Sequence, residues 1–208
     1  PVLVFLVFSA SIFLPKLKEG LKGRFQTYDR IKSFLKEKHT NNDIYWFHAA
    51  SLGEFYQVKP IIEGMKKMKK DNIMFVSFSS PSGMNYAFSD AIDLKFYLPF
   101  DFPWTIQKVL TMVKPKKVVF STYDIWPNFV WFCKTKNIHL NVMSAKIGHH
   151  SIKHRPFVMH FYKSLYKLFD TIYTITEKDK NSFERMVGSE VKPIVSSLGN
   201  PRFDTIFN

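Results

Sequence analysis

The sequence predicts an α/β fold in which helices cover both faces of a parallel β-sheet. Short apolar runs of β-preferring residues alternate along the chain with longer segments of helical periodicity. These runs lack the in-and-out alternation of half-exposed strands, which is typical of strands buried on both faces. Strands are therefore expected at residues 44–47, 73–78, 94–98, 117–121, 138–143, 171–175 and 191–196.

The chain of 208 residues, 46% of them hydrophobic, is long enough to bury one sizeable core. No internal repeat, low-complexity tract or linker divides it, so residues 19–208 are expected to form one domain. Cys133 is the only cysteine and lies in an apolar segment. An internal disulfide is thereby excluded, and a core position in a reducing compartment is favoured.

The first residues suggest a membrane anchor. Residues 1–14 carry no charge and are mostly Val, Leu, Phe and Ile, and a basic flank follows within residues 16–24. This order predicts an N-terminal anchor helix over residues 1–18, with the following domain on the cytoplasmic side by the positive-inside rule. The run is shorter than the ~20 residues of a spanning helix and the chain starts at Pro1, so the anchor could be truncated. A buried or interfacial helix is the alternative.

Residues 19–43 are charged and helical in tendency. They predict an amphipathic surface helix whose apolar side is formed by Phe25, Tyr28, Ile31, Phe34 and Leu35.

The segment His48–Gln57 joins the first expected strand to a helix through a turn of small residues. Glu54 then stands in the first helical turn at the carboxyl end of a strand, where open α/β sheets bind ligands. Ser51 and Glu54 also have the S-x-x-E spacing of a capping box, so a purely structural role is one interpretation. Gly53 and the two alanines before Ser51 would let a ligand approach the backbone closely, which favours the second interpretation, a ligand-binding site.

Charge and composition limit the classes of partner. The net charge of +13 suits an acidic partner, namely anionic lipid, a phosphorylated substrate or nucleic acid. The aromatic residues cluster in apolar runs, so core packing explains them better than stacking on nucleic acid. His149, His150 and His154 have no Cys, Asp or Glu nearby, so no metal site is expected, and no phosphate-binding glycine fingerprint points to a cofactor.

Five segments in order resemble one bacterial family. Residues 48–54 resemble its H-(A/S)-x-S-x-G-E motif, 80–83 its T-P-T-G turn, and 97–103 its Y-L-P-x-D-x-P segment. Residues 125–128 resemble its L-W-P-N, and 199–204 its G-(N/S)-x-K-F-D. The family is that of the 3-deoxy-D-manno-octulosonic acid (Kdo) transferases, inner-membrane glycosyltransferases of lipopolysaccharide core synthesis.

The resemblance implies the N-terminal half of a GT-B type glycosyltransferase, in which two Rossmann-like halves face each other. The N-terminal half would receive the acceptor, a lipid A precursor (lipid IVA). The C-terminal donor-binding domain, which would bind CMP-Kdo, is expected to be absent from this chain. The resemblance also implies that the protein lies on the cytoplasmic side of the inner membrane, held by a single N-terminal anchor. Its partner would be an anionic membrane, and it would bind no nucleic acid.

The resemblance further assigns residues to roles. Glu54 would be the general base of an inverting transfer, and Arg202 would stabilise charge on the leaving group. The positions expected to bind the acceptor are Ser51, Gly53, Ser80, Ser82, Gly83, Asp124, Lys146 and Ser151. For Ser80, plain capping of the helix that starts at Pro81 is the alternative.

The chain departs from the family pattern at two places. The E-x-E that usually precedes L-W-P-N is reduced to Thr122 and Asp124, and R-x-S-x-x-S keeps only Lys146 and Ser151. Two further hypotheses therefore stand beside the transferase: a non-catalytic, membrane-associated binding module of the same fold, and a basic nucleic-acid-binding protein.

Overall fold

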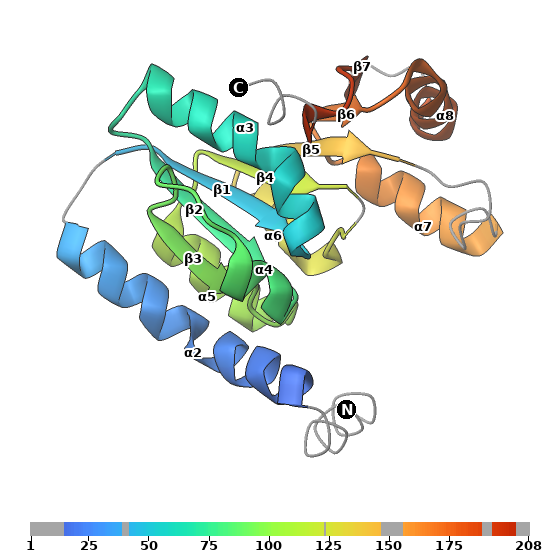
Figure 1. Ribbon diagram of the computed structural model, residues 1–208. Coiled ribbons are helices and arrows are strands. Elements are labelled where there is room, and N and C mark those ends of the chain that lie inside the picture. The colour runs from blue at the N-terminus through green and yellow to red at the C-terminus, as the bar shows by residue number, and fades with distance from the viewer. Residues whose placement is uncertain (1–14, 39–41, 123, 147–155, 189–192, 203–208) are drawn as a thin grey trace.

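The computed structural model describes residues 15–38, 42–122, 124–146, 156–188 and 193–202. Its centre is one seven-stranded sheet in which every pair of neighbouring strands is parallel, in the order β3-β2-β1-β4-β5-β6-β7 (Figure 1). The strands are β1 (Ile44–Ala49), β2 (Ile73–Phe78), β3 (Leu94–Tyr97), β4 (Lys117–Ser121), β5 (His139–Ala145), β6 (Thr171–Thr174) and β7 (Ile194–Ser197). The predicted parallel α/β sheet is confirmed.

Helices connect the strands in turn and lie on both faces of the sheet. They are α2 (Pro15–Lys38), α3 (Leu52–Met68), α4 (Pro81–Tyr86), α5 (Pro103–Val113), α6 (Pro127–Thr135), α7 (Pro156–Tyr166) and α8 (Glu177–Val187). Five of them, α2, α4, α5, α6 and α7, begin at a proline, which suits the first helical position because the missing N–H would have no intrahelical partner there.

The two faces have separate apolar cores. The smaller core joins α3 and α4 to the sheet around Phe47, Phe55 and Phe78. The larger core, around Trp46 and Phe120, receives α2, α5, α6, α7 and α8. Because both faces are covered, β2 is buried at every residue, as its nearly continuous apolar sequence predicts.

Helix α2 packs closely over the end of β3. A side chain at Gly23 would collide with the Tyr97 ring, and the Thr27 hydroxyl donates to the Tyr97 carbonyl at 2.7 Å. Ile31 is fully buried, as the amphipathic pattern predicts, whereas Phe25 is 61% exposed. Phe25 departs from the pattern because it lies off the helix face that carries the buried Leu21, Thr27 and Ile31. Its ring contacts Phe100 in the loop after β3 at 5.4 Å between centroids.

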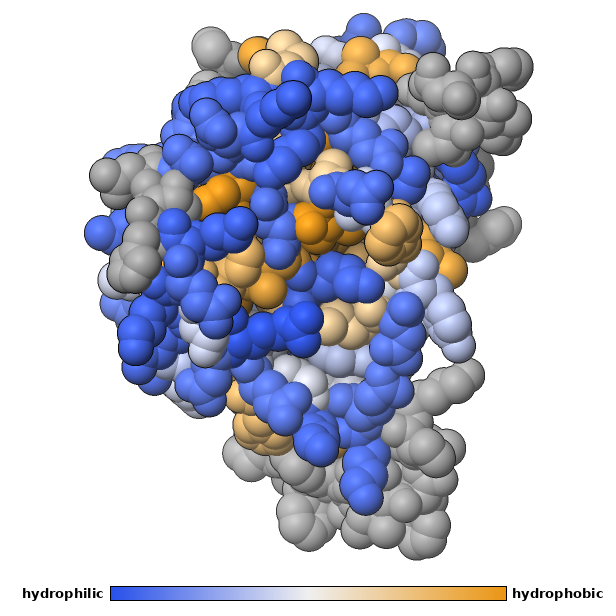
Figure 2. Space-filling model, turned by 60° about the vertical axis from the view of Figure 1, so that its left-hand side comes forward, coloured by the Kyte–Doolittle hydropathy of each residue, from blue (hydrophilic) through white to orange (hydrophobic). Residues whose placement is uncertain are grey.

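The expected anchor falls mainly outside the described residues, because residues 1–14 do. The boundary expected at residue 18 lies inside α2. Within the described part of the chain, no helix is both long and apolar enough to cross a bilayer. The face seen in Figure 2 is mainly hydrophilic, with hydrophobic residues confined to patches between the polar ones.

Candidate active site

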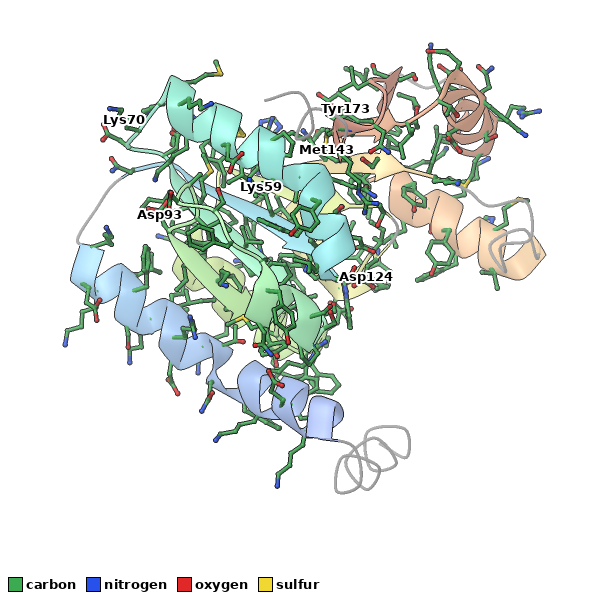
Figure 3. All side chains as sticks on the ribbon, viewed as in Figure 1. Lys59, Lys70, Asp93, Asp124, Met143 and Tyr173 are labelled. Atoms are coloured by element: carbon green, nitrogen blue, oxygen red, sulfur yellow. The ribbon has the colours of Figure 1, made fainter. Side chains whose placement is uncertain are left out.

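The site lies where the strand order reverses, between β1 and β4. Connections leave these two strands in opposite directions, and in open α/β sheets ligands bind outside the carboxyl ends of the strands at such a point, in what we call the β1–β4 crevice. The turn after β1 brings Glu54 to this edge, and the turn after β4 brings Asp124. Figure 3 shows Asp124 beside the first turn of α3 at this end of the sheet.

Glu54 and Ser51 form the contacts of a cap at the start of α3. The Ser51 hydroxyl accepts from the Glu54 amide at 3.4 Å, and Glu54 Oε2 accepts from the Ala50 amide at 2.7 Å. The carboxylate thus reaches back one residue further than in a standard capping box. The cap orients the carboxylate and leaves the side chain partly exposed. The structural and chemical roles of Glu54 are therefore compatible.

The surroundings favour the protonated form of Glu54. Burial raises the pKa of Glu54 above its ordinary value, and the nearby negative charge of Asp124 raises it further. The Ala50 amide, the Thr122 side chain and His48 act in the opposite direction without cancelling the rise in pKa. A carboxylate with a raised pKa is a stronger base, which is what general-base catalysis near neutral pH requires.

Asp124 belongs to a hydrogen-bonded network with His48, whose side chain is fully buried. His48 Nε2 lies 3.1 Å from Asp124 Oδ2, and the Ser79 hydroxyl donates to the same oxygen at 2.9 Å. On the other side of the ring, His48 Nδ1 lies 3.0 Å from the Ser77 hydroxyl, which accepts from Trp46 Nε1 at 2.8 Å. An ionised carboxylate only accepts hydrogen bonds, so Nε2 carries a proton.

This network keeps Asp124 ionised. Burial by itself would raise the pKa of Asp124, but His48 and Ser79 outweigh that effect and hold the pKa below its ordinary value. The Asp124 side chain is 32% exposed, so its carboxylate still reaches the crevice. The site therefore combines one carboxylate that is held ionised with a second one, Glu54, that more readily takes up a proton.

Arg202 returns to the site from the far end of the described chain. Its Nη2 donates to the carbonyl of Gly53, the residue before Glu54. A Cβ at Gly53 would lie 3.4 Å from that nitrogen. The two residues expected to be catalytic are thus neighbours, although 148 positions separate them in the sequence.

The segment from Ser80 to Gly83 lies beside the Glu54 turn, since the Ser80 amide donates to the Ala50 carbonyl at 2.9 Å. Ser80 occupies the cap position of α4, but its side chain makes no capping bond and instead pairs with the Ser82 hydroxyl at 2.9 Å. Gly83 is buried, and a Cβ there would collide with the Phe78 ring. Its lack of a side chain therefore has a packing reason.

Two other expected acceptor positions follow β5. Lys146 is exposed at the end of that strand, and Ser151 lies outside the described residues, as do His149, His150 and His154. Among the described residues, no group of His, Cys, Asp and Glu side chains has the arrangement of a metal site.

Two residues with strained backbones lie near the ends of neighbouring strands, Thr122 directly after β4 and Ser144 within β5, one residue before its end. Thr122 has φ 59° and Ser144 has φ 54°, a left-handed conformation that is costly for residues with a Cβ and most so for β-branched threonine. Both side chains are buried. Thr122, which stands where the family pattern has a glutamate, acts on Glu54 by lowering its pKa.

Two more of the resembling segments meet at the start of α6. Asp101 accepts from the amides of Asn128 at 3.0 Å and Phe129 at 2.9 Å, and the Asn128 side chain donates to the Asp101 carbonyl at 2.6 Å. These bonds cap the N-terminus of α6, the helix that begins three residues after Asp124.

Sequence reasoning gave no role to His48, Ser77, Ser79 or Arg24. The two serines could have been noticed as polar residues at the end of an otherwise apolar strand, and His48 as the polar end of another. Arg24 had no distinguishing signal among the 30 basic residues of the chain.

Solved structures share the fold. The UDP-GlcNAc 2-epimerase from Neisseria meningitidis bound to UDP-GlcNAc superposes with a TM-score of 0.57 at 15% identity, over 80% of this chain and 48% of the other. A second UDP-N-acetylglucosamine 2-epimerase structure gives a TM-score of 0.57 at 10% identity, over 80% of this chain and 51% of the other. At these identities the likeness shows the fold alone.

Relatives by sequence are more specific. A 3-deoxy-D-manno-octulosonic acid transferase of Aquifex aeolicus is 27% identical over 180 residues, which cover 85% of this chain and 46% of that protein. One from Chlamydia pneumoniae is 28% identical over 187 residues, which cover 86% of this chain and 43% of that protein. The chain thus spans less than half the length of these relatives. The family model described as 3-deoxy-D-manno-octulosonic-acid transferase (kdotransferase) matches residues 19–205, so the chain belongs to this family.

Proposed function

We propose that this chain is the acceptor-binding half of a Kdo transferase of lipopolysaccharide core synthesis, with Glu54 as its general base. The observation that carries the proposal is the place and state of Glu54. Its carboxylate lies at the carboxyl edge of the sheet by the β1–β4 crevice, is oriented by the Ala50 amide, and has a raised pKa. Membership of the family supports the reaction class.

The reaction would be a single displacement. A hydroxyl oxygen of a lipid A precursor attacks the anomeric carbon of Kdo while Glu54 takes the hydroxyl proton. The bond from that carbon to the phosphate of CMP breaks, and its electron pair leaves with the phosphate. Attack opposite the leaving group inverts the anomeric centre and requires no covalent enzyme intermediate.

Arg202 would stabilise the negative charge that develops on the leaving phosphate. Its contact with the Gly53 carbonyl supports this role, because it brings a permanent cation next to the base. Ser51 and Gly53 shape the same turn. Ser80, Ser82, Asp124, Lys146, Ser151 and, less directly, Gly83 remain proposed acceptor positions.

The donor CMP-Kdo would be bound mainly by residues beyond this chain, since the relatives are more than twice as long as the segment that matches. The acceptor is a phosphorylated lipid, which suits the net charge of +13. An anionic inner membrane, reached from its cytoplasmic side, remains the proposed location.

The test is Glu54→Gln in the full-length enzyme. Glutamine can still accept from the Ala50 amide, so the free energy of unfolding should change by less than ~1 kcal/mol. Turnover should fall by ~10²- to 10⁴-fold, because the amide cannot take the proton. Transfer is measured from CMP-Kdo to lipid IVA, and unfolding by denaturant titration.

Ser51→Ala is the matched control, because it removes the other side-chain contact of the same cap. It should cost ~1 kcal/mol of stability and leave a larger share of the activity. Near-full activity of a folded Glu54→Gln enzyme would make Glu54 a cap only. Absence of transfer by the unmodified full-length protein would instead favour the non-catalytic binding module, which the replacement of a family glutamate by Thr122 allows.

A further inference from the structure

We infer that Arg24 of α2 is a positioning residue of this site, which fixes Ser79 and Asp124 at the edge of the crevice. The inference rests on the proposed function only for its effect on sugar transfer. The contacts that carry it belong to the structure itself.

The Arg24 guanidinium joins the ends of two strands. Its Nη1 donates to the Leu98 carbonyl, directly after β3, at 2.7 Å, and its Nη2 donates to the Ser79 carbonyl, directly after β2, at 3.3 Å. Ser79 is the residue whose hydroxyl donates to Asp124 at 2.9 Å. Arg24 therefore positions the backbone of Ser79, and Ser79 in turn positions the Asp124 carboxylate.

Two aromatic rings enclose the same guanidinium. Its central carbon lies 5.6 Å from the centroid of Phe100 and 5.6 Å from that of Trp126. Phe100 belongs to the loop after β3, and Trp126 follows Asp124 by two residues. A planar cation can stack on rings and bridge two carbonyls at once, whereas the ammonium of lysine can do neither in the same way.

Arg24 also acts on Asp124 through its charge. Burial lowers the pKa of Arg24, and attraction to Asp124 opposes that change. The attraction is mutual, so Arg24 favours the ionised carboxylate. The charged and titratable groups facing Asp124 are then Arg24 from α2, His48 from β1 and Glu54 from α3, with Arg24 the permanent cation among these three.

The first experiment follows the Asp124 carboxyl carbon by NMR during a pH titration of this chain, with Asp124→Asn to assign the signal. Arg24→Gln removes the cation and should raise the pKa of Asp124. The matched control is Arg30→Gln, which removes an exposed arginine of the same helix and should leave that pKa unchanged. A role of Arg24 in docking α2 alone would not move the titration.

The second experiment measures transfer in the full-length enzyme. Arg24→Lys keeps the charge but loses the carbonyl bridge and the stacking, so kcat should fall by about 10- to 100-fold through misplacement of the site. The kcat of Arg24→Gln should fall at least as far, whereas the kcat of Arg30→Gln should not fall. If Arg24→Gln does not fold, Arg24→Lys carries the test.

An unchanged Asp124 titration in a folded Arg24→Gln chain, or a kcat in Arg24→Lys equal to that of the unmodified enzyme, would overturn the inference. The proposed function is tested by a different outcome of the same experiments. If the unmodified enzyme shows no transfer but Arg24→Gln still raises the pKa of Asp124, the positioning role stands and the reaction assignment falls.

Discussion

Glu54 and Asp124 lie close enough to influence each other, yet their surroundings move their pKa values in opposite directions. At Glu54 the effect of burial, which raises the pKa, outweighs the effect of the hydrogen-bond donors, which lower it. One oxygen of Asp124 is contacted by the buried His48 imidazole and the Ser79 hydroxyl, and the effect of these donors on the pKa outweighs the effect of burial. Its depressed pKa stabilises the fold above the pKa of an unfolded aspartate, and this stabilisation is lost as the pH falls through the folded value. The raised pKa of Glu54 has the opposite effect, so the two carboxyls partly compensate each other.

The pH dependence of transfer should report this coupling. The acid limb of kcat/KM should reflect ionisation of Glu54 and lie above the ordinary glutamate range. Asp124→Asn removes a neighbouring negative charge, which lowers the pKa of Glu54 and should shift the limb to lower pH. Asp90→Asn, which changes an exposed carboxylate, is the control. A shift of the acid limb to higher pH in Asp124→Asn would contradict the assignment of Glu54 as the base.

At the residue scale the sequence predicted local structure, whereas the chemical role of Glu54 stays a prediction. Glu54 could be placed because a strand, a small-residue turn and a helix follow one another within a short segment. The His48–Asp124 pair could not, because it joins positions 76 residues apart and depends on which strands are neighbours. Arg24 could not be singled out either, since the acceptors of its hydrogen bonds are main-chain carbonyls, which no residue type in the sequence identifies.

At the level of elements, α2 owes its position to close contact with β3. Gly23 allows the helix backbone to approach the Tyr97 ring, and the neighbouring residue is Arg24. The same helix has a second glycine, Gly20, where an added Cβ would meet nothing within 4 Å. The amphipathic pattern predicted the helix but not how near it lies to the sheet, because closeness depends on one missing side chain.

The two glycines should respond oppositely to alanine. Gly20→Ala should raise the free energy of unfolding by up to about 1 kcal/mol, since alanine is the better helix former and finds open space. Gly23→Ala should lower it by about 1–3 kcal/mol, because the methyl group would push α2 away from Tyr97. Denaturant unfolding of both variants measures the difference. Equal stabilisation by both would show that α2 does not pack as described.

On the scale of the whole molecule, the sequence predicted the parallel sheet and its strands to within a few residues. The apolar runs were long enough to mark strands buried on both faces, and helical segments separated them. Strand ends were less certain: β5 extends to Ala145 beyond its apolar run, and β7 begins at Ile194. Pairing with neighbouring strands fixes those ends, and pairing is a property of the complete sheet.

The chain alone should not catalyse transfer, because the relatives contain more than twice its matched length and the donor would be bound beyond it. Incubation of the purified chain with CMP-Kdo and lipid IVA should yield no Kdo-modified lipid by mass spectrometry. The same assay with a full-length protein is the positive control. Product formed by the isolated chain would refute the division into acceptor and donor halves.

The direction of α2 has a topological consequence. The helix runs against the strands, with its later turns over the body of the sheet and Arg24 at the carboxyl edge (Figure 1). At 1.5 Å per residue, Pro15 precedes Arg24 by about 14 Å along the helix axis. Helix α2 therefore begins on the carboxyl side of the sheet, the side that carries Glu54 and Asp124. A membrane tether ahead of α2 would hold the domain by its crevice side, so that tethering and catalysis would share one geometry.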